Sequence, residues 1–128
     1  MAPLRLLLTD DDQVDRMAIS RLLRHTGLEI AVGECADRAS ALTLLEAGNF
    51  DCVLLDYYIP GSDGLEILKS IRRRGQALPV IVLTGQGDEE VAVELMKAGA
   101  ADYLNKNTLT AERLERSLRY AMALHRAH

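Results

Sequence analysis

The chain has 128 residues, enough for one domain whose core needs neither disulfides nor a structural metal. Hydrophobic residues make up 48% and charged residues 27%, a balance typical of a soluble globular protein. The net charge of −4 argues against direct nucleic-acid binding by this domain, and no apolar run approaches the length of a membrane span.

The cysteines and the N-terminus indicate a compartment. Cys35 and Cys52 lie in apolar stretches without C-x-x-C spacing, and the three histidines form no ligand pattern with them. We interpret both as buried free thiols in a reducing environment. The start MAPLRLLLT is too short and too quickly charged for a signal peptide. We therefore expect a cytoplasmic protein.

Five apolar runs predict five strands, at residues 4–9, 29–35, 51–56, 79–84 and 101–105. Near-continuous apolar runs of this length are typical of parallel strands that are covered on both faces. Segments with helical periodicity separate the runs and follow the last one. Alternating β and α elements imply right-handed crossovers and a doubly wound α/β sheet.

The helical segments carry start and stop signals. We expect Asp12, Asp37 and Thr110 to cap three of the helices, and glycines at 27, 48, 75 and 99 to end four of them. The apolar spacing places Met17 on the inner face of the first helix and Met96 on that of the fourth. No linker or internal repeat divides the chain.

Polar side chains collect where the predicted strands end. Because the carboxyl ends of parallel strands meet at one edge, we expect these side chains to converge. Carboxylate oxygens without thiolate or imidazole suit Mg²⁺, which can also accept a phosphoryl oxygen. A hydroxyl and an ammonium would stabilise a transferring phosphoryl group, and a carboxylate can itself form an acyl phosphate. The residues concerned are Asp10, Asp11, Asp12, Asp56, Thr84 and Lys106.

Four motifs, in this order, span essentially the whole chain: LLLTDDD, VLLDYYIPGSDGLE, PVIVLTG and AGAADYLNK. Together they resemble the receiver domain of two-component response regulators. The resemblance implies a flavodoxin-like (βα)5 fold, with five parallel strands in the order 2-1-3-4-5 and helices on both faces. It also implies one receiver domain over residues 1–128, whose terminal helix is either a plain end or a connector to a further module.

The same resemblance implies a phosphoacceptor and a metal site. Asp56 would accept a phosphoryl group from a phosphohistidine on a sensor histidine kinase or a phosphotransfer protein. Asp10 and Asp11 would hold Mg²⁺ together with Asp56 and the backbone carbonyl of Tyr58. The domain would be a signalling switch and not an enzyme, apart from Mg²⁺-dependent self-phosphorylation and autodephosphorylation.

The switch residues also follow from the resemblance. Thr84, Gly85 and Lys106 would bind the phosphoryl group, and the rotamer of Tyr103 would report the conformational state. The surface of the fourth helix, fifth strand and fifth helix would then change for an effector protein or an attached output module. This surface has an acidic fourth helix and a basic fifth helix, which suggests a phosphorylation-dependent homodimer as a further hypothesis.

Three positions depart from the family pattern or vary within it. Asn107 follows the lysine where most members have proline, so a cis-proline bend is not assumed. Tyr58 and Gln86 stand two residues beyond Asp56 and Thr84. In the family that the chain resembles, these positions influence how water reaches the acyl phosphate. Our hypothesis is that Tyr58 shields the site and lengthens the phosphorylated lifetime.

Three other readings compete. LLLTDDDQV also fits the D-x-D-x-V pattern of haloacid-dehalogenase-type phosphatases, with Asp10 as nucleophile and Asp12 as acid/base. That family needs a late acidic metal motif, whereas the late acids here, Glu112 and Glu115, lie on a predicted helix, and Asp56 would go unexplained. A pseudo-receiver, which is a binding module with the receiver fold and no phosphorylation, would lack residues that phosphorylation requires, and none of them is missing from this sequence. Flavodoxin-like cofactor binding would need a phosphate-cradling loop in place of the aspartates.

Overall fold

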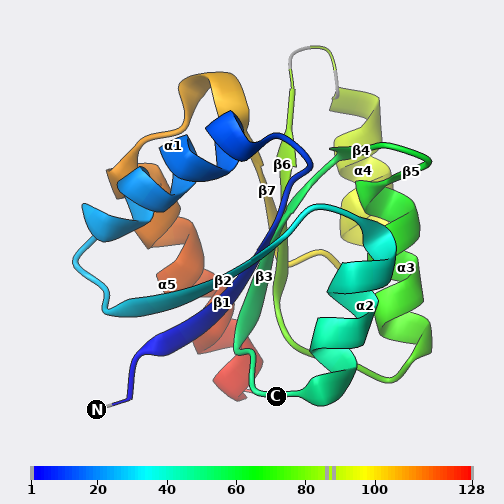
Figure 1. Ribbon diagram of the computed structural model, residues 1–128, viewed down its shortest axis with the longest axis horizontal. Helices are drawn as coiled ribbons and strands as arrows, with labels where there is room; N and C mark the ends of the chain where they lie inside the picture. The colour runs from blue at the N-terminus through cyan, green and yellow to red at the C-terminus, as the bar shows by residue number, and fades with distance from the viewer. Residues whose placement is uncertain (1, 86, 88, 128) are drawn as a thin grey trace.

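The computed structural model describes residues 2–85, 87 and 89–127. Its central sheet has five parallel strands in the order β2-β1-β3-β6-β7 (Figure 1). Numbered without the short β4 and β5, which lie outside this sheet, the order is the predicted 2-1-3-4-5. The strands are β1 (Leu4–Thr9), β2 (Ile30–Cys35), β3 (Cys52–Asp56), β6 (Val80–Thr84) and β7 (Asp102–Asn105).

Helices cover both faces of the sheet, as predicted (Figure 1). One apolar cluster joins α2, α3 and α4 to one face, and a second joins α1 and α5 to the other. Among the described residues, no helix is both long and apolar enough to cross a membrane. The helices are α1 (Gln13–Arg24), α2 (Arg38–Ala47), α3 (Gly64–Arg73), α4 (Glu89–Lys97) and α5 (Ala111–Ala127).

The strands read as continuous apolar runs because both of their faces are buried. Successive side chains point to opposite faces of a sheet, so Val53 packs toward α2–α4 while Leu54 packs toward α1 and α5. The core is almost wholly aliphatic. Both cysteines are free and buried, as predicted, and burial raises the pKa of Cys52 to about 12.

The predicted caps are confirmed. The side chain of Asp12 accepts hydrogen bonds from two N–H groups in the first turn of α1, and Asp37 accepts one from Ser40. The Thr110 hydroxyl accepts the Arg113 N–H at 3.1 Å. These side chains satisfy backbone donors that have no partner within the helix.

Two inner-face predictions are wrong. The side chain of Met17 is 63% exposed and that of Met96 is 46% exposed. On α1 the buried residues are Ile19 and Leu23, and Met17 lies on the opposite side because each helical position turns about 100°. On α4, Met96 follows the buried Leu95 and is turned away from the core by the same angle.

A short hairpin follows β3. β4 (Tyr58–Ile59) and β5 (Ser62–Asp63) pair antiparallel, with Pro60 and Gly61 between them. Gly61 has φ +75°, and proline followed by a positive-φ glycine is the pattern of a type II turn. Ile59 is buried in the core that contains α2–α4, so the hairpin is anchored immediately after the edge of the sheet.

Candidate functional site

Three carboxylates gather at the carboxyl edge of the sheet. Asp10 follows β1 and Asp56 ends β3, and these two strands are hydrogen-bonded neighbours. One oxygen each from Asp10, Asp11 and Asp56 lies within 4.8 Å of the others. Asp10 and Asp56 are buried, whereas Asp11 is exposed. The predicted convergence of these side chains is confirmed.

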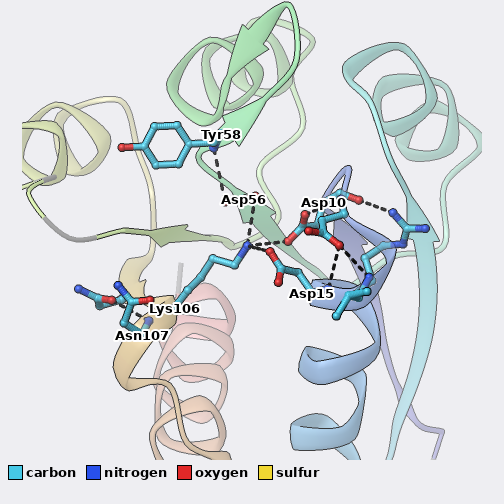
Figure 2. Close-up of polar contacts among 10 residues, drawn as sticks. Asp10, Asp15, Asp56, Tyr58, Lys106 and Asn107 are labelled. Atoms are coloured by element: carbon cyan, nitrogen blue, oxygen red, sulfur yellow. Dashed lines mark hydrogen bonds and ion pairs between the residues drawn. The ribbon is translucent and has the colours of Figure 1, made fainter.

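Lys106 places its ammonium among the carboxylates (Figure 2). It begins a 3-10 helix (Lys106–Thr108) that follows β7, and its Nζ lies 2.9 Å from Asp10 Oδ2 and 3.3 Å from Asp56 Oδ2. A third carboxylate, that of Asp15, is 2.7 Å away. Burial lowers the pKa of Lys106, but its hydrogen bonds and the neighbouring charges outweigh burial and raise the pKa above its ordinary value. The ammonium therefore stays charged.

The Asp56 carboxyl is an unusually weak acid. Burial and then the charge of Asp10 raise its pKa to about 6, although Lys106 and the Tyr58 N–H act in the opposite direction. The ammonium of Lys106 pairs with the carboxylates of Asp10, Asp15 and Asp56, and the Asp11 carboxylate lies beside those of Asp10 and Asp56. Their mutual repulsion favours binding of a further cation.

The donor set of this cluster fits a hard divalent cation. Its converging atoms are carboxylate oxygens, which Mg²⁺ and Ca²⁺ prefer over nitrogen or sulfur. The Tyr58 N–H donates to Asp56 Oδ1 at 3.4 Å, so the start of β4 lies against the carboxylate. The backbone carbonyl of Tyr58 remains a predicted ligand.

A cavity of about 490 Å³ opens onto the carboxylates. Acidic side chains at the start of α1, the Lys106–Asn107 segment and Tyr58 line its polar part, and apolar residues of α1 with Leu109 line the rest. The Tyr58 ring is exposed and packs edge-on against Tyr57, with 5.1 Å between ring centroids. Asp56 and Tyr58 both line this cavity.

The structure places Thr84 at the same edge but directs its hydroxyl elsewhere. Thr84 ends β6, next to β3, and its Oγ1 donates to the Leu104 carbonyl of β7 at 3.4 Å. Tyr103, on β7, is 43% exposed. A cavity of about 190 Å³ lies between them and is lined by both residues and by Gly85. The Thr84 hydroxyl would have to rotate away from β7 to reach a group on Asp56.

Gly64 explains the sharp path of the chain beyond Asp56. The Gly64 N–H donates to the Tyr57 carbonyl at 2.7 Å. A Cβ at Gly64 would lie 2.9 Å from the Tyr57 Cα and 3.3 Å from the Asp56 carbonyl oxygen. Only glycine lets α3 begin this close to the backbone at the end of β3.

Two residues near the site were not predicted from the sequence. Asp15 binds Lys106, and Arg16 donates from Nη1 to the Asp10 carbonyl at 2.5 Å and pairs with Glu34 at 3.0 Å. Asp15 lies in the first turn of α1, where an acid is ordinarily attributed to the helix dipole. The sequence offered no signal that a lysine 91 residues later would reach it.

Of the other two positions singled out from the sequence, the structure describes Asn107 but not Gln86. The Asn107 N–H donates to the Asn105 side chain at 2.8 Å, so the segment after Lys106 is ordered without proline. The peptide bonds of the described residues are all trans. Gln86 lies outside the described residues.

Residues 6–119 match the family model of the response regulator receiver domain. The chain belongs to the response regulator receiver family. Domains of this family act as phosphorylation-dependent switches in two-component signalling, and the fold and the acidic edge described above are those of a receiver.

Similar proteins include regulators and solved receivers. The transcriptional regulatory protein FixJ of Azorhizobium caulinodans is 42% identical over 100 residues, covering 76% of this chain and 45% of FixJ. The response regulator MprA of Mycolicibacterium vanbaalenii is 36% identical over 114 residues, covering 89% of this chain and 48% of MprA. A receiver domain protein from Clostridium thermocellum superposes with TM-score 0.86 at 29% identity, covering 96% and 97% of the two chains. The chain spans about half the length of the curated relatives it matches.

Proposed function

We propose that Asp56 is the phosphoacceptor of this receiver. The observation that supports the assignment most strongly is its position: a buried carboxylate at the end of β3, clustered with Asp10 and Asp11 and 3.3 Å from the ammonium of Lys106. Asp10 and Asp11 lack this position at the end of the central strand. The raised pKa of Asp56 also makes its carboxylate more basic than an ordinary aspartate, which suits a nucleophile.

The transfer joins an Asp56 oxygen to the phosphorus of a phosphohistidine and breaks the phosphorus–nitrogen bond, so the imidazole leaves. Asp10, Asp11, Asp56 and the Tyr58 carbonyl would hold Mg²⁺, which supplies positive charge to the phosphoryl oxygens. Lys106, whose Nζ lies 3.3 Å from Asp56 Oδ2, adds a second positive charge. Asp10, Asp11 and Lys106 lie beside Asp56 before a donor arrives, which supports stabilisation of the transition state by charges already in place.

The phosphoryl group then acts as the signal. It adds negative charge and acceptor oxygens, which offer Thr84 a better partner than the Leu104 carbonyl. Rotation of the Thr84 hydroxyl, with Gly85 beside it, would let Tyr103 move toward the cavity between them. The α4–β7–α5 surface would change as a result, because Tyr103 lies on β7 between the two helices.

The partners follow from this switch. A sensor histidine kinase or a phosphotransfer protein would donate the phosphoryl group, and an effector or output module would read the α4–β7–α5 surface. FixJ and MprA are about twice as long as the matched segment, which supports α5 as a connector from this receiver domain, residues 1–128, to a further module. A phosphorylated homodimer would pair the acidic α4 with the basic α5. Chemistry beyond self-phosphorylation and autodephosphorylation is not expected.

Intact-mass spectrometry with acetyl phosphate tests the phosphoacceptor. We expect one added phosphoryl group on the parent with Mg²⁺, and none with EDTA or in Asp56→Asn. Asp63→Asn is the matched control, because Asp63 caps α3 on the same loop and asparagine caps equally well. An adduct that survives in Asp56→Asn would point to Asp10 and to phosphatase-like chemistry instead.

A further inference from the structure

The ion pair between Asp15 and Lys106 has no place in the function described so far. Its 2.7 Å separation is the shortest of the three around the ammonium, and it joins the first turn of α1 to the segment after β7. We propose that Asp15 is a positioning residue that keeps Lys106 beside Asp56 when a divalent cation occupies the carboxylates. The proposal rests on the phosphoacceptor role of Asp56.

A bound cation would weaken the ion pairs of Lys106 with Asp10 and Asp56. Asp10 and Asp56 belong, with Asp11, to the group of oxygens that converge within 4.8 Å. A cation bound there draws on those oxygens and also repels the ammonium by like charge. The Asp15 carboxylate is outside this group, so it stays available to Lys106 when the other two do not.

Asp15 is exposed enough to hold Lys106 only weakly, so it can also release the ammonium. The Asp15 side chain is 44% exposed, so its attraction to Lys106 is weakened by solvent. Lys106 has a flexible stem, and without any anchor its ammonium would swing toward water. The ammonium lies between Asp15 on α1 and Asp56 on β3 (Figure 2), so a small rotation takes it from one to the other.

A simpler explanation makes a different prediction. An acid in the first turn of a helix interacts favourably with the helix dipole whatever lies nearby. In that case Asp15 would contribute to stability alone, and its effect would depend on neither Lys106 nor the cation. Removing its charge would, if anything, ease the approach of an anionic phosphodonor.

The ammonium NMR signal of Lys106 separates these explanations without measuring activity. The chain has three lysines, Lys69, Lys97 and Lys106, so assignment is simple. An ammonium held in ion pairs exchanges slowly with water and gives a sharp signal. We expect the parent signal to persist both in EDTA and with saturating Mg²⁺. In Asp15→Asn it should persist in EDTA and disappear with Mg²⁺.

The control for charge is Glu66→Gln, which neutralises an exposed first-turn acid of α3. It should behave as the parent does. The proposal is overturned if the Asp15→Asn signal survives saturating Mg²⁺, or if the parent signal is lost there as well.

Phosphorylation kinetics give a second, independent test. At saturating Mg²⁺, Asp15→Asn should take phosphate from acetyl phosphate about three- to fivefold more slowly, as expected for loss of a half-exposed ion pair. Asp15→Glu should restore part of the rate, and Asp15→Asn should have no further effect in a Lys106→Met background. A parent that takes no phosphate would refute the phosphoacceptor, whereas an equally fast or faster Asp15→Asn beside a labelled parent would refute only the role of Asp15.

Discussion

At the scale of single residues, the chemistry depends on crowding of like charges. Asp56 is buried beside Asp10, and both depend on one lysine for compensation. The fold maintains this repulsion in the absence of a cation, at a cost in stability. This repulsion favours binding of Mg²⁺ at the carboxyl edge of the sheet, and its cost in stability can be measured in the protein without a cation.

Asp56→Asn should stabilise the cation-free protein. Burial and Asp10 raise the pKa of Asp56 from 3.8 to about 6, so its charged form destabilises the fold. The cost is absent below pH 3.8, grows as the pH rises to about 6 and is fully present above that. In EDTA at pH 7.5 the free energy of unfolding should rise by about 3 kcal/mol. Urea titration at pH 7.5 and 4 measures this, and an equal gain at both values would contradict it.

Tyr58 bears on how long the phosphorylated state lasts. Its ring stands exposed beside the opening onto Asp56. Asparagine is smaller and can orient a water molecule toward the acyl phosphate, so Tyr58→Asn should lose phosphate severalfold faster. The decay of the phosphorylated mass after removal of donor measures this. Equal decay of parent and variant would show that Tyr58 does not shield the site.

At the scale of elements, the sequence predicted the features that depend on neighbouring residues, namely the strands and the helix caps. The strands, the caps at Asp12 and Asp37 and the strand order follow from apolar runs, short-range hydrogen bonds and the family motifs. Met17 and Met96 were misplaced because hydrophobicity alone does not say which side of a helix meets the sheet. The Asp15–Lys106 ion pair joins residues that are 91 positions apart, so no local pattern could predict it.

The start of α3 is an element whose geometry depends on one glycine. Gly64→Ala would place a Cβ 2.9 Å from the Tyr57 backbone, which must move and take Asp56 with it. We expect a loss of about 1–3 kcal/mol in the free energy of unfolding and slower phosphorylation. Gly48→Ala is the control, because its φ of +85° strains alanine far from Asp56. It should destabilise the protein without slowing phosphorylation, and the same rate loss in both variants would refute this account.

At the scale of the whole molecule, the helices differ in how they connect to the carboxyl edge of the sheet. α4 shares a layer with α2 and α3, but α4 and α5 are the helices that flank β7, whose carboxyl end adjoins Thr84 and Lys106 (Figure 1). Phosphorylation at the edge can therefore reach one surface through β7. α2 lies beyond β1 and β3 from β7, at the other side of the sheet.

Amide hydrogen exchange should reveal this asymmetry. With acetyl phosphate and Mg²⁺, exchange should change in α4, β7 and the start of α5 and stay constant in α2. Thr84→Ala should still accept phosphate but should lose most of the change, because the hydroxyl that leaves Leu104 is absent. Equal changes in α2 and in α4, or a full response in Thr84→Ala, would contradict the proposed route.

The most direct test of the central claim locates the acyl phosphate itself. Borohydride reduces an aspartyl phosphate to homoserine, which marks the acceptor position permanently. The parent protein would be treated with acetyl phosphate and Mg²⁺, reduced, digested and sequenced by tandem mass spectrometry. The account predicts homoserine at position 56 alone, and none when Mg²⁺ is withheld. Homoserine at position 10 or 11 with position 56 intact would contradict it.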